Sequence, residues 1–218
     1  MKFCVIFLLL FCVTVLSAQS QRREDRDNQF WNETQLVVWE NDKNELSLVG
    51  NLRVGRNISF PSDYRAGFLY THKFSKFFAL AGGYVYRAAF PFENRKTFEN
   101  RFNIAATITV PLPKKIKLIN RNQVEYRANN SRPDVKLYRN RVQIEREVNV
   151  RGTKITPFGS TEIFYTKTNG WFRLRSIIGI RKKLTEKITG DIFYQHQFDG
   201  FSRPGDLNVI GTTLKIHL

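Results

Sequence analysis

Arginine and glutamate side chains recur at every second position along several stretches of this 218-residue sequence. In one of them, Arg121, Glu125 and Arg127 share a parity with Gln123. Neighbouring antiparallel strands hold such side chains about 4.5–5.5 Å apart, which is close enough for guanidinium–carboxylate pairs. The charged positions that follow this pattern are Glu99, Arg101, Arg121, Glu125, Arg127, Arg139, Arg141, Glu145, Arg173 and Arg175.

Two kinds of chemistry fit this charged set. It can form a structural network that fills a narrow barrel and neutralises itself. Alternatively, its surplus of arginines, including Arg173 and Arg175, can leave a positive constriction that attracts anions. The residue types leave both interpretations open.

An enzyme needs a nucleophile, a base and a group that orients the base. His196 is the histidine that a surface esterase or lipid-modifying enzyme would use, but it shares the parity of Ile192 and Tyr194, which favours an ordinary interfacial histidine. Glu125 and Glu145 are poor candidates for an acid/base couple because adjacent arginines would hold both carboxylates ionised. We therefore predict no catalytic residues.

Cofactors and nucleic acids are not expected partners. The sequence carries no metal motif, phosphate loop or nucleotide fingerprint, so no metal and no cofactor is predicted. The formal net charge is +16, but the basic residues are spread strand by strand and mixed with carboxylates rather than gathered into a patch. This pattern argues against nucleic acid and favours attraction to anionic lipopolysaccharide.

Apolar and polar residues alternate with a period of two through most of the chain, which predicts strands with one apolar face. Val142 and Ile144, for example, alternate with Arg141 and Glu145. No linker or shift in composition divides the chain, so we expect one all-β domain. About eleven strands are predicted, near 30–40, 45–55, 63–72, 76–89, 96–110, 114–129, 134–149, 153–167, 170–182, 186–198 and 206–217.

The first residues have the layout of a secretory signal peptide: an early lysine, an apolar run and small residues before the cleavage site. We place cleavage after Ala18, with Ser20 as the alternative. Both cysteines, Cys4 and Cys12, lie in this segment, so the mature protein is expected to contain none. The predicted organisation is a signal peptide at 1–18, a polar lead-in at 19–29 and a β-barrel at 30–218.

The predicted strands are long enough to cross a bilayer, which takes about 9–11 tilted residues. Charges on the lipid face would cost roughly 2–4 kcal/mol each at the midplane, so the charged face must line the lumen. Aromatic residues near strand ends suit interfacial girdles. The expected fold class is all-β, a transmembrane antiparallel up-and-down β-barrel of about 10–12 strands; a soluble periplasmic β-barrel binding protein is the alternative.

The predicted strand number is odd, whereas bacterial single-chain barrels have even numbers. Either the aromatic stretch Trp31–Trp39 does not span the membrane, or one weak strand is missing from the prediction.

Three short motifs resemble an uncharacterised bacterial family, domain of unknown function 2490. They are Trp31-Asn32-Glu33-Thr34-Gln35, the Asn-Arg-x-x-x-Glu-x-Arg run at 120–127 and the Tyr-Arg-x-Arg-x-x-x-Glu run at 138–145. The resemblance covers most of the mature chain and implies an outer-membrane β-barrel without an established activity. One departure from the usual barrel pattern is Leu218, because an aromatic residue is commoner at the end of the last strand.

The sequence thus predicts an outer-membrane protein of a Gram-negative bacterium, serving as a structural or narrow-pore barrel with an Arg/Glu-lined lumen. An outer-membrane lipid-modifying hydrolase is the enzymatic alternative. The expected partners are outer-membrane lipids, lipopolysaccharide and the barrel assembly machinery.

Overall fold

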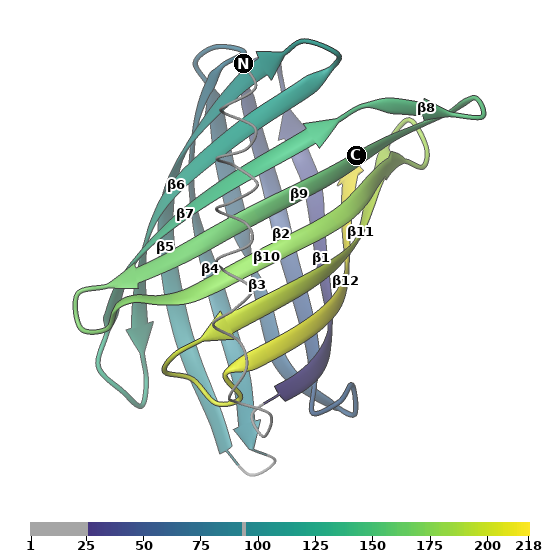
Figure 1. The fold of residues 1–218 in the computed structure, drawn as a ribbon. Coiled ribbons are helices and arrows are strands. Elements are labelled where there is room, and N and C mark those ends of the chain that lie inside the picture. The colour runs from purple at the N-terminus through teal and green to yellow at the C-terminus, as the bar shows by residue number, and fades with distance from the viewer. Residues whose placement is uncertain (1–25, 93–94) are drawn as a thin grey trace, which may run out of the picture.

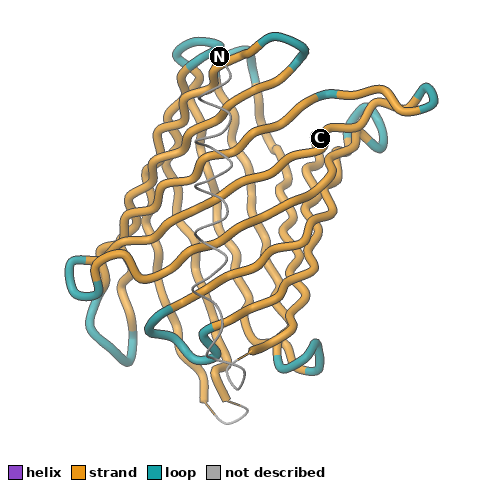
Figure 2. Tube along the Cα trace, viewed as in Figure 1, coloured by secondary structure: helices purple, strands orange, loops and turns teal. Residues whose placement is uncertain are grey.

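The computed structural model describes residues 26–92 and 95–218, and all of the regular structure in these ranges is β-strand (Figure 2). All eleven predicted strands are present, and a twelfth, very short strand continues the seventh. The strands are β1 (Arg26–Glu40), β2 (Asn44–Gly55), β3 (Phe60–Lys73), β4 (Phe78–Phe92), β5 (Arg95–Leu112), β6 (Ile116–Asn129), β7 (Val135–Arg146), β8 (Val148–Val150), β9 (Thr153–Thr166), β10 (Gly170–Lys183), β11 (Ile188–Asp199) and β12 (Asp206–His217).

The expected signal peptide lies outside the described residues. β1 begins at Arg26, so the last four residues of the expected lead-in, 26–29, are already part of the first strand.

The strands close into a barrel (Figure 1). Each spanning strand pairs with the next one along the chain in antiparallel fashion, with β7 pairing directly with β9. β8 pairs only with the start of β9, and together they form a hairpin that projects beyond the barrel rim (Figure 1). Closure means that no spanning strand leaves its backbone hydrogen-bonding groups unpaired, as a membrane barrel requires.

One strand pair is parallel, which corrects the expectation of a purely antiparallel barrel. β12 closes on β1 in parallel register, from Arg26 opposite Asp206 to Val37 opposite His217. An odd number of up-and-down strands can close only if its first and last strands run in the same direction. Both explanations offered for the odd count are therefore wrong: β1 spans the barrel, and residues 26–92 and 95–218 contain no spanning strand beyond the eleven predicted.

Short polar turns end the strands where the sequence supplies turn residues. The Asn41 side chain accepts hydrogen bonds from the backbone N–H groups of Lys43 and Asn44, at 3.0 and 2.8 Å, and thereby fixes the β1–β2 turn. At the tip of the β8–β9 hairpin, Gly152 has a φ of 82°, a conformation that favours glycine.

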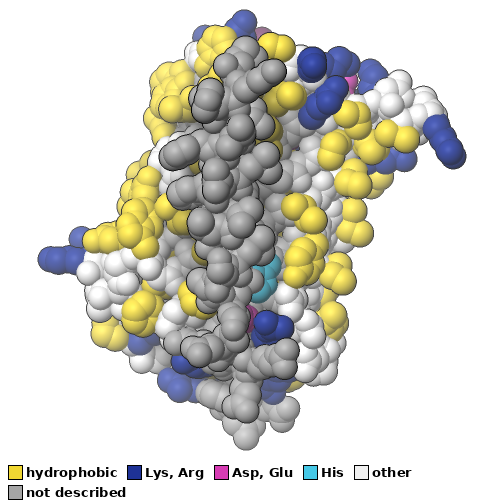
Figure 3. Space-filling model, viewed as in Figure 1, with side chains coloured by type: hydrophobic (Ala, Val, Ile, Leu, Met, Phe, Trp, Pro, Cys, Tyr) yellow, Lys and Arg dark blue, Asp and Glu magenta, His cyan; other side chains and the backbone are white. Residues whose placement is uncertain are grey.

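The two faces of the sheet have opposite polarity. Apolar side chains point outward, with Ile178 66% exposed, whereas polar and charged side chains point inward, with Glu99 only 1% exposed. Figure 3 shows hydrophobic side chains over the barrel wall and lysine and arginine toward its two ends. None of the described residues forms a helix that could cross a membrane. The predicted transmembrane polarity is confirmed: the apolar face is outside and the charged face is inside.

Candidate functional site: the charged interior

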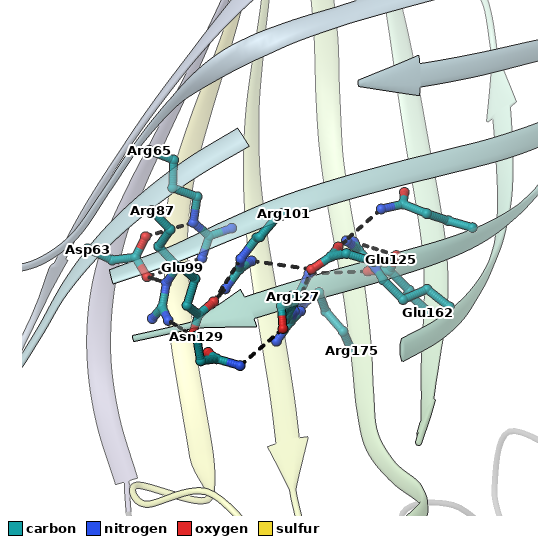
Figure 4. A network of polar contacts seen from close by, with 12 residues as sticks. Asp63, Arg65, Arg87, Glu99, Arg101, Glu125, Arg127, Asn129, Glu162 and Arg175 are labelled. Atoms are coloured by element: carbon teal, nitrogen blue, oxygen red, sulfur yellow. Dashed lines mark hydrogen bonds and ion pairs between the residues drawn. The ribbon is translucent and has the colours of Figure 1, made fainter. Parts of the chain in front are cut away.

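An unbroken series of ion pairs runs around the inner face of the barrel (Figure 4). It begins on β3, where Asp63 accepts from Arg65 at 2.7 Å and also from Arg87 of β4. Arg87 donates in turn to Glu99 of β5 at 2.7 Å. Asp63 thus lies between two guanidinium groups, which compensate its charge inside the barrel.

The series continues through β5, β6, β7 and β9. Arg101 contacts both Glu99 and Glu125, the latter at 3.6 Å. Arg139 then forms ion pairs with both Glu125, at 3.4 Å, and Glu162, at 2.7 Å.

The series ends on β10, where Arg175 donates to Glu162 at 3.1 Å and to the Gln197 amide oxygen of β11 at 2.7 Å. Beyond that point, aromatic and apolar side chains complete the circuit. The Arg175 guanidinium lies 5.2 Å from the centre of the Trp31 ring on β1, and Arg53 of β2 lies over the same ring at 3.4 Å. Trp31 packs in turn with Leu207 and Val209 of β12.

Side chains at this level pack against one another inside the barrel. Phe164 points into the barrel and is only 1% exposed. The centre of its ring lies 4.9–5.2 Å from the guanidinium carbons of Arg139, Arg173 and Arg175. Asp199, which accepts from Arg173 at 2.6 Å, is fully buried. Neighbouring side chains therefore shield Phe164 and Asp199 from water. We call this set of residues the charge layer: Asp63, Arg65, Arg87, Glu99, Arg101, Glu125, Arg127, Arg139, Glu162, Phe164, Arg173, Arg175 and Asp199.

The structure divides the ten predicted positions into three groups. Seven belong to the charge layer: Glu99, Arg101, Glu125, Arg127, Arg139, Arg173 and Arg175.

Glu145 belongs to a separate contact, with Arg181 at 3.1 Å and Lys117 at 3.8 Å. Arg121 and Arg141 face each other on β6 and β7 but pair with no carboxylate of the described chain within 4 Å.

Sequence reasoning missed several members of the charge layer. Asp63 and Arg65 form an isolated charged pair on β3, and Arg87, Glu162 and Asp199 are single charges among uncharged residues, so no dense charged run marks them. Their parity was the available signal, because each shares its strand's polar face.

His196 lies on the outer face, as its parity predicts, in register between Ser176 of β10 and Asn208 of β12. Its Nδ1 lies 3.3 Å from the Asn208 side-chain oxygen. The described chain contains no hydrogen bond between His196 and Ser176, and it contains no cluster of metal-ligating side chains.

The fold and its charged interior define a β-barrel of the outer-membrane type. The chain belongs to a family described as a protein of unknown function (DUF2490), whose model matches residues 28–208. The family resemblance seen in the sequence motifs is thereby confirmed. No curated protein matches the chain.

Two solved structures share the fold. LpxR from Salmonella typhimurium is 11% identical, with a TM-score of 0.55, and the match covers 84% of this chain and 86% of LpxR. The β domain of the Bordetella autotransporter BrkA is 10% identical, with a TM-score of 0.50, and the match covers 78% of this chain and 89% of that domain. At these identities the likeness establishes a shared barrel fold and carries no activity to this chain.

Proposed function

We propose that this chain is a structural barrel of the Gram-negative outer membrane whose lumen is closed by the charge layer. The observation that carries the proposal is the unbroken ion-pair series from β3 to β10, completed by the packing around Trp31. The apolar outer face supports residence in a bilayer, and the likeness to outer-membrane barrels supports that compartment. The proposed route there is a cleaved signal peptide followed by the barrel assembly machinery.

The lipid partners follow from the distribution of side chains. The apolar band would contact hydrocarbon, and the lysines and arginines at the two ends would contact anionic head groups, including those of lipopolysaccharide. Lipopolysaccharide is expected to raise the unfolding temperature of the purified protein. Absence of that increase would count against contact between the basic ends of the barrel and lipopolysaccharide.

Conductance in planar lipid bilayers tests the closed lumen. Purified protein that shows heat-modifiable migration in gels, and is therefore folded, is expected to give no stepwise conductance. A narrow, porin-like pore is the competing result, and the arginine surplus of the inner face would make it anion-selective. In that case conductance would appear in the wild type and would fall, or change ion preference, in Arg139→Gln and Arg141→Gln variants.

The alignment of Ser176, His196 and Asn208 across three neighbouring strands favours a second candidate, an outer-membrane lipid-ester hydrolase. Nδ1–H of His196 would donate to Asn208, leaving Nε2 free to take the proton of Ser176 as its hydroxyl attacks an acyl carbonyl. Nε2 would then return that proton to the departing alcohol, and water would release the acyl group. Turnover of phospholipid esters that Ser176→Ala and His196→Ala both abolish would establish this activity; absence of turnover in the wild type would exclude it for those substrates.

A further inference from the structure

Arg121 and Arg141 are the two predicted arginines that the charge layer does not use. They are directly opposite each other on β6 and β7. Like charges placed opposite one another in an antiparallel pair are destabilising. Nothing in the described chain relieves this repulsion at close range, because neither guanidinium group has a carboxylate within 4 Å or donates a side-chain hydrogen bond.

The nearest candidates for compensation are already engaged. Glu162, which lies opposite Arg141 on β9, gives its carboxylate oxygens to Arg139 and Arg175. Glu33 of β1 accepts from the Asn51 amide at 2.9 Å. Both carboxylates act on the arginine pair only from a distance.

Arg121 and Arg141 line a cavity of about 160 Å³ on the inner face of the barrel. We call this cavity the recess. Its lining residues are Leu69, Thr71, Ala79, Leu80, Ala81, Thr107, Arg121 and Arg141. Small residues leave this space. β4 contributes Ala79 and Ala81 to the recess, whereas it contributes the much larger Arg87 to the charge layer. Neither Thr71 nor Thr107 makes a side-chain hydrogen bond to any described residue, so both hydroxyls can serve a ligand.

These features specify the chemistry of an occupant. Guanidinium donors from two neighbouring arginines match the oxygens of a phosphate or carboxylate group. A water molecule occupies about 30 Å³ in the liquid, so the recess has room for roughly five, and it is smaller than the roughly 300–1,000 Å³ of drug-sized ligand sites. We infer that the recess binds one small oxyanion of the size of inorganic phosphate between Arg121 and Arg141.

The inference does not depend on whether the lumen conducts. A closed barrel would bind the anion at the end of a blind recess, and a conducting barrel would bind it along the path. The phosphate-binding experiment therefore tests the recess independently of the conductance experiment, which tests the closed lumen.

Calorimetric titration of the folded, detergent-solubilised protein with inorganic phosphate tests the inference, with sodium chloride holding ionic strength constant. The wild type is expected to bind phosphate saturably at one site. Each of Arg121→Gln and Arg141→Gln is expected to weaken binding about tenfold or more, because each removes charge-assisted hydrogen bonds. The matched control is Arg146→Gln, which removes the same charge from the exposed end of β7 and should leave binding unchanged.

Thermal unfolding gives a second readout. In phosphate-free buffer, Arg121→Gln is expected to unfold at a higher temperature than the wild type, because it relieves the repulsion with Arg141. Phosphate should raise the unfolding temperature of the wild type and of Arg146→Gln more than that of either recess variant. Heat-modifiable migration confirms that each variant is folded. Absence of saturable phosphate binding in the wild type, or equal binding by the wild type and both glutamine variants, would overturn the inference.

Discussion

The charge layer and the recess lie on the same inner face of the same strands and use the same side chain, arginine, in opposite ways. In the layer, Arg101 and Arg139 each lie between two carboxylates. In the recess, a few residues further along β6 and β7, Arg121 and Arg141 face each other beside a cavity. An arginine on the inner face can therefore either form ion pairs or remain without a carboxylate partner. The residues opposite it on the neighbouring strands decide which.

The difference lies in the neighbouring strands. β5 supplies Glu99 to the layer but Thr107 to the recess, and β4 supplies Arg87 to the layer but Ala79 to the recess. Large, oppositely charged residues form ion pairs where they meet, and small neutral residues leave space and unbalanced charge. Substitutions that distinguish the two regions should therefore differ in sign as well as in size.

The largest expected effect is removal of a carboxylate from the layer. Glu125 is 4% exposed and contacts Arg101, Arg127 and Arg139. Glu125→Ala leaves buried guanidinium groups uncompensated and should lower the free energy of unfolding by about 3–5 kcal/mol. Urea-induced unfolding in lipid vesicles measures this loss.

Glu147→Ala is the matched control, because Glu147 forms its ion pair with Lys115 at an exposed turn. It should unfold like the wild type. Equal stability of Glu125→Ala and Glu147→Ala would mean that the ion-pair series does not hold the layer together.

The outer face common to both regions provides the next prediction. Ile178→Arg places a charge against hydrocarbon and should destabilise the barrel by about 2–4 kcal/mol if the residue lies near the midplane. Ile178→Ala removes the same side chain without adding a charge and should cost much less. If both variants unfold alike in vesicles, the outward face is not in contact with lipid.

A cross-strand pair of alanines sharpens the comparison of packing. Ala105 is 1% exposed, whereas its neighbour Ala81 lines the recess. Ala105→Phe should cost about 1–3 kcal/mol because it overpacks a filled site. Ala81→Phe should cost less than 1 kcal/mol and should block phosphate binding. The reverse order of stabilities would contradict the location of the cavity.

The smallest effect concerns the β6–β7 loop, outside the spanning strands. The Tyr126 hydroxyl donates to Asp134 and lowers the pKa of that carboxyl, with a further hydrogen bond from the Asn129 backbone N–H at 3.0 Å. Because the folded-state pKa is lowered, these bonds stabilise the loop above the ordinary aspartate pKa and are lost as the pH falls through the lowered value. Hydrogen exchange of the amide groups in residues 130–134, expressed relative to the intrinsic exchange rate at each pH, should therefore accelerate at acidic pH in the wild type. The same exchange in Asp134→Asn should show little change over that pH range, and a parallel pH response in both proteins would contradict this role.

Much of the fold could be predicted from the sequence because strand alternation and turn residues are local signals. The alternation of Val142 and Ile144 with Arg141 and Gln143, for example, identifies both the strand and its charged face. The parallel closure of β1 on β12 follows from the predicted odd number of strands, because eleven up-and-down strands can close only with the first and last parallel. It was missed because bacterial single-chain barrels have even strand numbers, so the odd count was attributed to an error in the prediction.

The candidate site was predictable in part. Dense charged runs located Glu125 and Arg139, but they could not separate paired from unpaired arginines, because pairing depends on side chains contributed by other strands. Asp63 and Glu162 lie outside the dense charged runs, and their roles emerge only when the barrel brings them beside Arg87 and Arg139. Register between strands is the missing information.

Side-specific cysteine labelling tests the closed lumen most directly. Thr97 and Thr107 point inward from β5 on opposite sides of the layer residues Glu99 and Arg101. With Cys4 and Cys12 removed, Thr97→Cys and Thr107→Cys would each be reconstituted in one orientation and treated with a small, water-soluble, membrane-impermeant thiol reagent on one side. A closed layer predicts that only one of the two variants reacts from a given side, and that the other reacts when the reagent is moved across. Rapid labelling of both variants from the same side would contradict a lumen closed by the charge layer.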